Sequence, residues 1–266
     1  MNKKKSLILL TIIVPVFAIL AGLVTYFFVL RSDTPAPVSI DNAIQQSKDI
    51  TSSIVVKESV LPDEGKKSQS GNINEKNSKA TLTKTDSSNS LVGTWVIDND
   101  VESFVGYRVK EELVSVGTFT AVGRTSLVEG SLNFTGTNIN SVTIKADLRG
   151  LKSDNRYRDQ ALSRQAIESA KFPYAEFILL DPILIQTIPS ENQIVDINAR
   201  GTLTLHGVTN YVEIALTGKL SSNKLFIIGT LPIIFIDYDI AKPSSRSVLS
   251  IEDNGIMELS LIFIKN

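Results

Sequence analysis

The chain has 266 residues, of which 42% are hydrophobic and 21% are charged, enough to bury a core in one or two domains. Its formal net charge of -1 argues against nucleic-acid binding, which needs a clustered basic surface. The absence of cysteine excludes disulfides, thiolate metal sites and a cysteine nucleophile.

A long apolar run stands near the N-terminus. Lys3, Lys4 and Lys5 precede uncharged, mostly apolar residues from Leu7 to Leu30, and Arg31 closes the run. As a helix this run would be about 36 Å long, enough to cross a hydrocarbon core of about 30 Å, whereas a signal peptide's apolar region has only about 7–15 residues. We therefore expect residues 1–31 to form a cytoplasmic stub and a single-pass cell-membrane anchor, with the rest of the chain extracytoplasmic. An unusually long signal peptide is the alternative.

The composition changes abruptly over residues 32–91. Proline, serine, threonine, asparagine, lysine and glutamine dominate, and no aromatic residue occurs between Arg31 and Trp95. Low hydrophobicity with mixed charge cannot offset the entropy lost on ordering, which predicts a disordered linker that holds the folded domain away from the membrane. Within it, Val38–Leu61 carries enough isoleucine and valine for a transient helix or strand.

Residues 92–266 have the pattern of a β domain. Short segments alternate apolar and polar residues with the two-residue period of half-buried strands, separated by Gly, Asn, Asp and Pro. One helical interruption is expected at roughly Asn155–Ala170. This predicts an all-β fold, an antiparallel barrel of about eight strands with a short helical insertion. The alternating segments include Phe104–Val109, Val128–Phe134, Val142–Leu148, Val195–Leu205, Val212–Leu216 and Ile256–Ile264.

The apolar face of these strands should form the barrel interior. An eight-stranded barrel has room inside for its side chains or for one small ligand. A filled core needs the same residues as a cavity, so the pattern alone leaves both open; in a cavity, Ala146 and Ala199 would be places to project a larger side chain into the void. The candidate ligand-binding residues are Phe104, Phe119, Phe134, Ile144, Leu148, Ile197, Leu203 and Ile214.

One charged cluster stands out in the helical insertion, formed by Arg156, Arg158 and Asp159. Guanidinium groups and a carboxylate on a short helix can clamp a loop through bidentate hydrogen bonds. They can equally face an anionic head group at a cavity mouth. Both roles stay open, and the structural clamp is favoured.

Catalytic and metal-binding patterns are weak. His206, the single histidine, lies in a predicted hairpin, which favours a turn or core role, and no G-x-S-x-G motif accompanies it. Asp98, Asp100 and Glu102 fail the calcium-loop spacing, because Ser103 stands where that pattern needs glycine. We expect these three carboxylates to be solvated, and we expect no catalytic residue, metal or cofactor.

Three ordered segments resemble the YceI-like family: LKSDNRYRDQAL (151–162), SAKFPYAEF (169–177) and GTLTLHGVTNYV (201–212). Arg158, Asp159 and Leu162 match its Arg-Asp..Leu segment. The resemblance implies a lipocalin-like barrel that carries a long apolar lipid, such as a polyisoprenoid, without catalysis. A first hairpin lacking the histidines of many members departs from that pattern. The alternatives are a structural or protein-interaction module with a filled core and, more weakly, a hydrolase of amphipathic substrates.

Overall fold

The computed structural model describes residues 34–58, 91–114 and 117–266. The expected anchor, Leu7–Leu30, lies outside these residues. Within the described ranges, no helix has both the length and the apolar character needed to span a bilayer.

Thirteen strands form one antiparallel sheet in the described part of the chain. Their alternation of apolar and polar residues follows the sequence pattern, because successive side chains of a strand point to opposite faces. The strands are β1 (Gly93–Ile97), β2 (Phe104–Leu113), β3 (Gly117–Thr125), β4 (Val128–Phe134), β5 (Asn138–Asp147), β6 (Lys152–Ser153), β7 (Tyr174–Leu179), β8 (Ile183–Leu184), β9 (Ile194–Leu205), β10 (Val208–Ser221), β11 (Lys224–Ile234), β12 (Val248–Ile251) and β13 (Asn254–Lys265).

The sheet closes on itself. The order β1-β4-β5-β7-β9-β10-β11-β13 returns to β1 through the pairing of Val96 with Ile264, which makes a ring of eight strands among the described residues. The predicted all-β antiparallel barrel of about eight strands is therefore confirmed. Strands β2, β3 and β6 extend the sheet beyond β13, and β12 pairs with β2.

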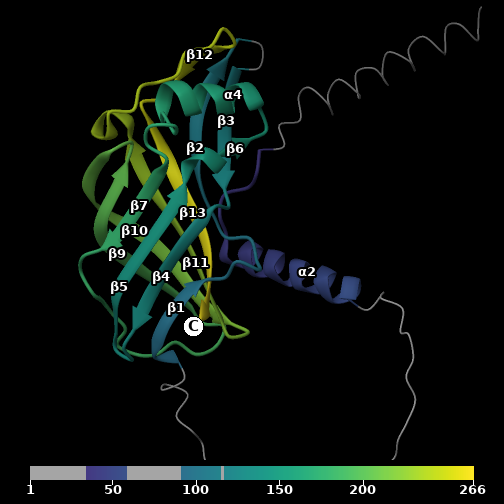
Figure 1. Cartoon of the computed structure of the whole chain (residues 1–266), viewed down its shortest axis with the longest axis vertical. Helices are drawn as coiled ribbons and strands as arrows, with labels where there is room; N and C mark the ends of the chain where they lie inside the picture. Colours follow the sequence, from purple (N-terminus) through teal and green to yellow (C-terminus); the bar gives the residue numbers. More distant parts are fainter. Residues whose placement is uncertain (1–33, 59–90, 115–116) are drawn as a thin grey trace, which may run out of the picture.

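The predicted helical insertion is also present. It consists of α4 (Arg156–Ala161) and the π-helical turn η3 (Leu162–Ala166). A short turn, η2 (Leu148–Gly150), precedes it, and another, η4 (Phe235–Tyr238), follows β11. Figure 1 shows α4 and β12 at one end of the barrel, and β1 with the C-terminus at the other. We call these the α4 end and the β1 end.

The apolar core fills much of the barrel interior. Leu132 of β4 and Phe263 of β13 are 2% and 1% exposed, and both belong to one continuous buried cluster with residues of β5, β7, β9 and β10. Leu259 and Leu261 belong to the same cluster, so the apolar face predicted for the last strand is the inner face. Burial of this aliphatic surface supplies the main stabilisation of the barrel.

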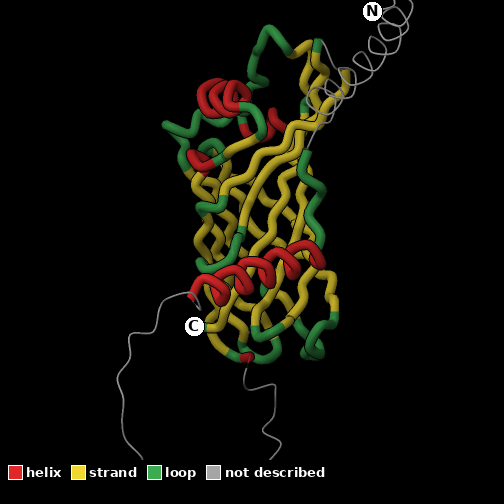
Figure 2. The backbone as a smooth tube through the Cα atoms, turned by 90° about the vertical axis from the view of Figure 1, so that its right-hand side faces the viewer, coloured by secondary structure: helices red, strands yellow, loops and turns green. Residues whose placement is uncertain are grey.

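A helix lies across the outer wall, where the sequence predicted a disordered linker. This helix, α2 (Ile40–Glu58), crosses the strands from outside (Figure 2). Ile40, Ala43 and Ile44 are buried against Phe226 and Ile262. The sequence analysis allowed a transient helix or strand over Val38–Leu61 within this linker, and the structure has a helix there. Residues 40, 43 and 44 repeat at helical spacing and form a short apolar stripe.

The residues before α2 are held to the same wall by hydrogen bonds. Arg108 donates to the carbonyl of Pro35, and Arg124 Nη2 donates to the carbonyl of Ala36 at 3.0 Å. Both guanidinium groups also bind Glu258, which is 1% exposed, at 2.7 and 2.8 Å. We call Thr34–Glu58 the N-terminal strap.

Candidate ligand-binding site

The α4 end of the barrel contains a cavity of about 530 Å³. Apolar side chains of β2, β3, β7, β9, β11 and β13 form its inner wall, and α4 and η3 cover one side. The exposed residues Tyr157 and Arg246 mark where the cavity reaches the surface. Representative lining residues are Val105, Val109, Ala121, Leu151, Ala175 and Met257.

A second, smaller cavity of about 120 Å³ lies at the β1 end. Trp95, Leu132 and Leu225 are among its lining residues. The interior therefore has a hollow at each end with packed core elsewhere.

The predicted ligand-binding residues divide between these places. Leu148 and Leu203 line the larger cavity, whereas Phe134 and Ile197 line the smaller one. Ile144 and Ile214 are buried in the core and line neither cavity. Ala146 and Ala199 are likewise core residues rather than places to project into a void.

Two of the predicted aromatic residues also line neither cavity. Phe104 lies on the face opposite Val105, which borders the larger cavity, and the Arg124 guanidinium sits 4.1 Å from the Phe104 ring centroid. Phe104 is buried on the other face of β2 from the cavity-lining residues Val105, Tyr107, Val109 and Glu111. Phe119 sits instead beneath Arg158, whose guanidinium carbon is 5.1 Å from its ring centroid.

Two polar residues that the sequence analysis did not select line the larger cavity, Tyr107 and Glu111. The Tyr107 hydroxyl is buried and forms no hydrogen bond of good geometry with a described residue, although the Ser153 side chain lies near it. Burial raises the pKa of Tyr107, so the phenol stays neutral. Its ring fits over Gly123 of β3, where an added Cβ would lie 2.4 Å from Tyr107 Cε1. The sequence showed only that Tyr107 and Glu111 share one face of a strand with Val105 and Val109, and not that this face is the inner one.

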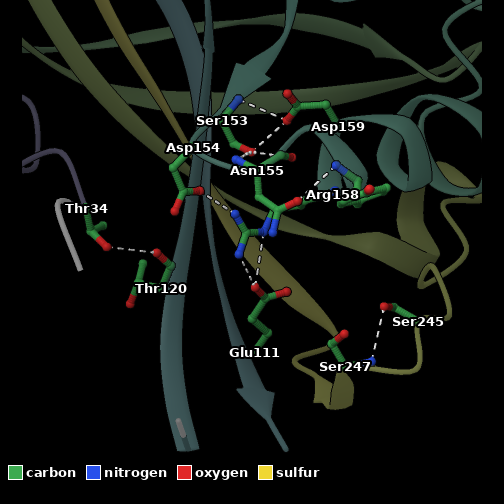
Figure 3. A network of polar contacts seen from close by, with 11 residues as sticks. Thr34, Glu111, Thr120, Ser153, Asp154, Asn155, Arg158, Asp159, Ser245 and Ser247 are labelled. Carbon is green, nitrogen blue, oxygen red and sulfur yellow. Dashed lines mark hydrogen bonds and ion pairs between the residues drawn. The ribbon is translucent and has the colours of Figure 1, made fainter. Parts of the chain in front are cut away.

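Arg158 joins α4 to the barrel wall beside this cavity (Figure 3). Its Nε and Nη2 donate to Oε1 of Glu111 at 3.1 and 2.6 Å, and its Nη1 donates to Asp154 Oδ1 at 2.5 Å. Burial lowers the pKa of Arg158, but the hydrogen bond to Glu111 and the charges of Glu111 and Asp154 outweigh it, and the pKa is raised. Two carboxylates therefore already compensate this cation.

Asp159 holds the other side of the insertion. It accepts hydrogen bonds from the backbone N–H of Ser153 at 2.9 Å and from the Ser153 hydroxyl at 2.6 Å. Arg158 and Asp159 thus bind different partners, on β2 and β6, rather than each other. Arg156 is exposed, with its guanidinium carbon 4.9 Å from the Tyr157 ring centroid. The arrangement favours the structural clamp for Arg158 and Asp159.

His206 has a structural place in the hairpin between β9 and β10. It adopts a φ of 53° and Gly207 a φ of 78°, the left-handed pair that a two-residue hairpin loop requires. Its Nδ1 donates to the carbonyl of Tyr238 at 2.9 Å, and its Nε2 lies 2.9 Å from Glu168 Oε2. Both ring nitrogens are thus occupied by contacts that join the hairpin to neighbouring loops.

One of the three carboxylates that we expected to be solvated is buried. Asp98 is 2% exposed and accepts a hydrogen bond from Lys224 Nζ at 2.7 Å, so it is not solvated. The backbone N–H of Asp98 also donates to the carbonyl of Ile262 on β13 at 2.8 Å, which holds this residue against the barrel wall. Asp100 and Glu102 are exposed.

Comparison with solved structures agrees with the barrel. A polyisoprenoid binding domain from Saccharophagus degradans superimposes with a TM-score of 0.51 and 15% identity, covering 65% of this chain and 98% of that domain. BcnA of Burkholderia cenocepacia gives a TM-score of 0.48 and 15% identity, covering 62% of this chain and 98% of BcnA. At these identities the likeness concerns the fold alone. No curated protein matches the chain. The sequence pattern of the YceI-like domain matches residues 95–263, more than half of the chain, and the protein therefore belongs to the YceI-like family.

Proposed function

We propose that this protein binds a long apolar lipid, such as a polyisoprenoid, in the larger cavity and carries it without catalysis at the outer face of the cell membrane. The observation that carries the proposal is the cavity of about 530 Å³ inside a closed barrel. Each methylene transferred from water to such a lining contributes about 0.8 kcal/mol. A closed apolar interior is therefore suited to a ligand with little solubility of its own.

The polar groups at the α4 end indicate which part of the lipid lies there. Arg158 is neutralised by Glu111 and Asp154, so it offers little to an anionic head group. The neutral hydroxyl of Tyr107 is the buried polar side-chain atom that forms no hydrogen bond of good geometry in the described part of the chain. An unpaired buried hydroxyl is unfavourable. A hydroxyl or carbonyl of the bound lipid would supply the missing hydrogen bond.

Two further observations support the proposal. One solved structure with this fold is described as a polyisoprenoid binding domain, and the run from Leu7 to Leu30 is long enough to anchor the chain in the membrane. A chain anchored in this way keeps its barrel next to the membrane that contains the lipid ligand.

The direct test uses the chain from Thr34 to Asn266, which includes every described residue. A fluorescent long-chain isoprenoid is titrated against it, and native mass spectrometry looks for a co-purifying apolar ligand. We expect saturable binding of one probe per chain. If no probe binds and no lipid co-purifies, the barrel is instead a structural or protein-interaction module.

A further inference from the structure

The N-terminal strap determines which end of the barrel lies nearest to a membrane anchor that precedes it. Thr34, the first described residue, donates its hydroxyl to the carbonyl of Thr120 on β3 at 3.4 Å (Figure 3). Thr120 lies three residues along β3 from Gly117, about 10 Å at the usual rise of a strand. The chain therefore first meets the barrel wall near the α4 end.

Few residues separate this contact from the expected membrane span. The apolar run ends at Leu30, and four residue steps to Thr34 reach at most about 14 Å when fully extended. Because the strap is bound to the wall, the residues after it add nothing to the reach of the barrel. The spacer predicted from the sequence is thus bypassed: the barrel would be held beside the bilayer rather than away from it.

Three large apolar side chains are exposed at this end. Val114 and Leu249 are 62% and 63% exposed, and Tyr157 is 67% exposed. Tyr157 lines the cavity, and the other two residues lie next to lining residues: Val114 follows Leu113 and donates its N–H to the carbonyl of Ser247 at 3.1 Å, and Leu249 follows Val248. We call Val114, Tyr157 and Leu249 the rim. Leu184 and Ile194 are similarly exposed at the β1 end, so exposed apolar residues alone do not show which end of the barrel faces the membrane. The position of the strap distinguishes the two ends.

Charge at the opening suits a membrane surface. Arg156 and Arg246 are exposed at this end, and neither forms an ion pair with another described residue. Of the exposed carboxylates there, Asp154 and Glu252 are paired with Arg158 and Lys110, and Glu112 is also exposed. Cations beside apolar and aromatic side chains are the usual combination of surfaces that rest on phospholipid head groups.

We propose that the strap holds the cavity opening against the bilayer and that the rim docks on phospholipid, so that a lipid can enter without crossing water. This inference rests on the membrane anchor of the proposed function. It adds an orientation of the barrel and a docking surface to that function.

The test uses the full chain reconstituted into vesicles of phosphatidylcholine and phosphatidylglycerol that contain a nitroxide-labelled lipid. Because the chain has no cysteine, Val114→Cys and Leu249→Cys each give one site for a fluorescent label. Leu184→Cys and Ile194→Cys are controls of comparable exposure at the β1 end. We expect the nitroxide to quench the rim labels several-fold more than the control labels.

Two insertion variants distinguish an orientation imposed by the strap from a general affinity of the rim for lipid. A flexible spacer of about 20 Gly and Ser residues between Asp33 and Thr34 adds a mean reach of roughly 25 Å. It should lower rim quenching toward the level of the controls. The same spacer between Ser68 and Gln69, which follows the strap, should leave rim quenching unchanged.

Equal quenching at both ends, or no effect of the first spacer, would overturn the inference, as would failure of the full chain to stay in the vesicles. Lipid carriage itself is judged separately, by probe binding to the chain from Thr34 to Asn266. Quenching at the rim without probe binding would leave the docking surface standing and refute the carrier.

Discussion

Ala146 of β5 and Ala175 of β7 lie directly opposite each other in the barrel wall, yet only Ala175 borders the larger cavity. Ala146 is 2% exposed and packs in the continuous core. These two alanines are paired across neighbouring strands but have different surroundings. Together they provide a matched test of whether the larger cavity binds lipid.

Replacing Ala175 by Phe should fill part of the cavity and abolish binding of the isoprenoid probe while changing the stability of the lipid-free protein little. Ala146→Phe forces a ring into packed core and should lower the free energy of unfolding by about 1–3 kcal/mol. Urea unfolding and probe titration of both variants check this. Equal destabilisation by both, with probe binding kept in Ala175→Phe, would contradict a ligand-binding cavity.

The link between Arg158 and Glu111 should matter for stability more than for lipid affinity. Their side chains are 16% and 7% exposed, so Arg158→Ala leaves a buried carboxylate facing the cavity and should cost about 3 kcal/mol. Arg200→Ala breaks an ion pair whose side chains are 64% and 43% exposed, and should lower the free energy of unfolding far less than Arg158→Ala does. An Arg158→Ala variant of normal stability that no longer binds the probe would instead indicate a head-group site.

The sequence predicted those features of the fold that depend on a regular spacing of apolar residues. Alternation predicted the barrel, and two of the residues selected from it, Leu148 and Leu203, border the larger cavity. The pattern could not separate lining from core: Leu203 borders the cavity and Ile214 does not, although both alternate alike. That difference depends on how far α4 and η3 stand from the wall, which is a matter of tertiary packing.

The polar part of the site was harder to predict. Tyr107 lies inward because Gly123, its partner across the strand pair, leaves room for the ring. Glu111 becomes a partner of Arg158 over a separation of 47 residues. Neither relationship has a local signature, since each depends on strand register.

Tyr107 should make the protein less stable in alkali. Burial raises its pKa above the ordinary value of 10.0, so above that pH the unfolded chain loses a proton that the folded chain retains. Its stabilising contribution is thus complete below pH 10 and falls by up to about 1.4 kcal/mol per pH unit above it. Urea unfolding of Tyr107→Phe should show a shallower alkaline loss, with a remainder from Tyr238, whose pKa burial also raises. Tyr211→Phe, at a side chain 85% exposed, is the control and should keep the wild-type slope.

The strap should contribute measurably to the stability of the barrel. Ile44 is 8% exposed and packs against the outer wall, whereas the adjacent Gln45 faces solvent. Ile44→Asp places a carboxylate on an apolar surface and should detach α2, lowering the free energy of unfolding by about 2–4 kcal/mol. Gln45→Asp introduces the same charge one residue later and should change stability by less than about 0.5 kcal/mol. Limited proteolysis of the full chain provides the second measurement, because a detached strap is cleaved between Thr34 and Glu58 and a bound one is protected. Equal stability and equal protection in the two variants would show that α2 does not hold the barrel wall.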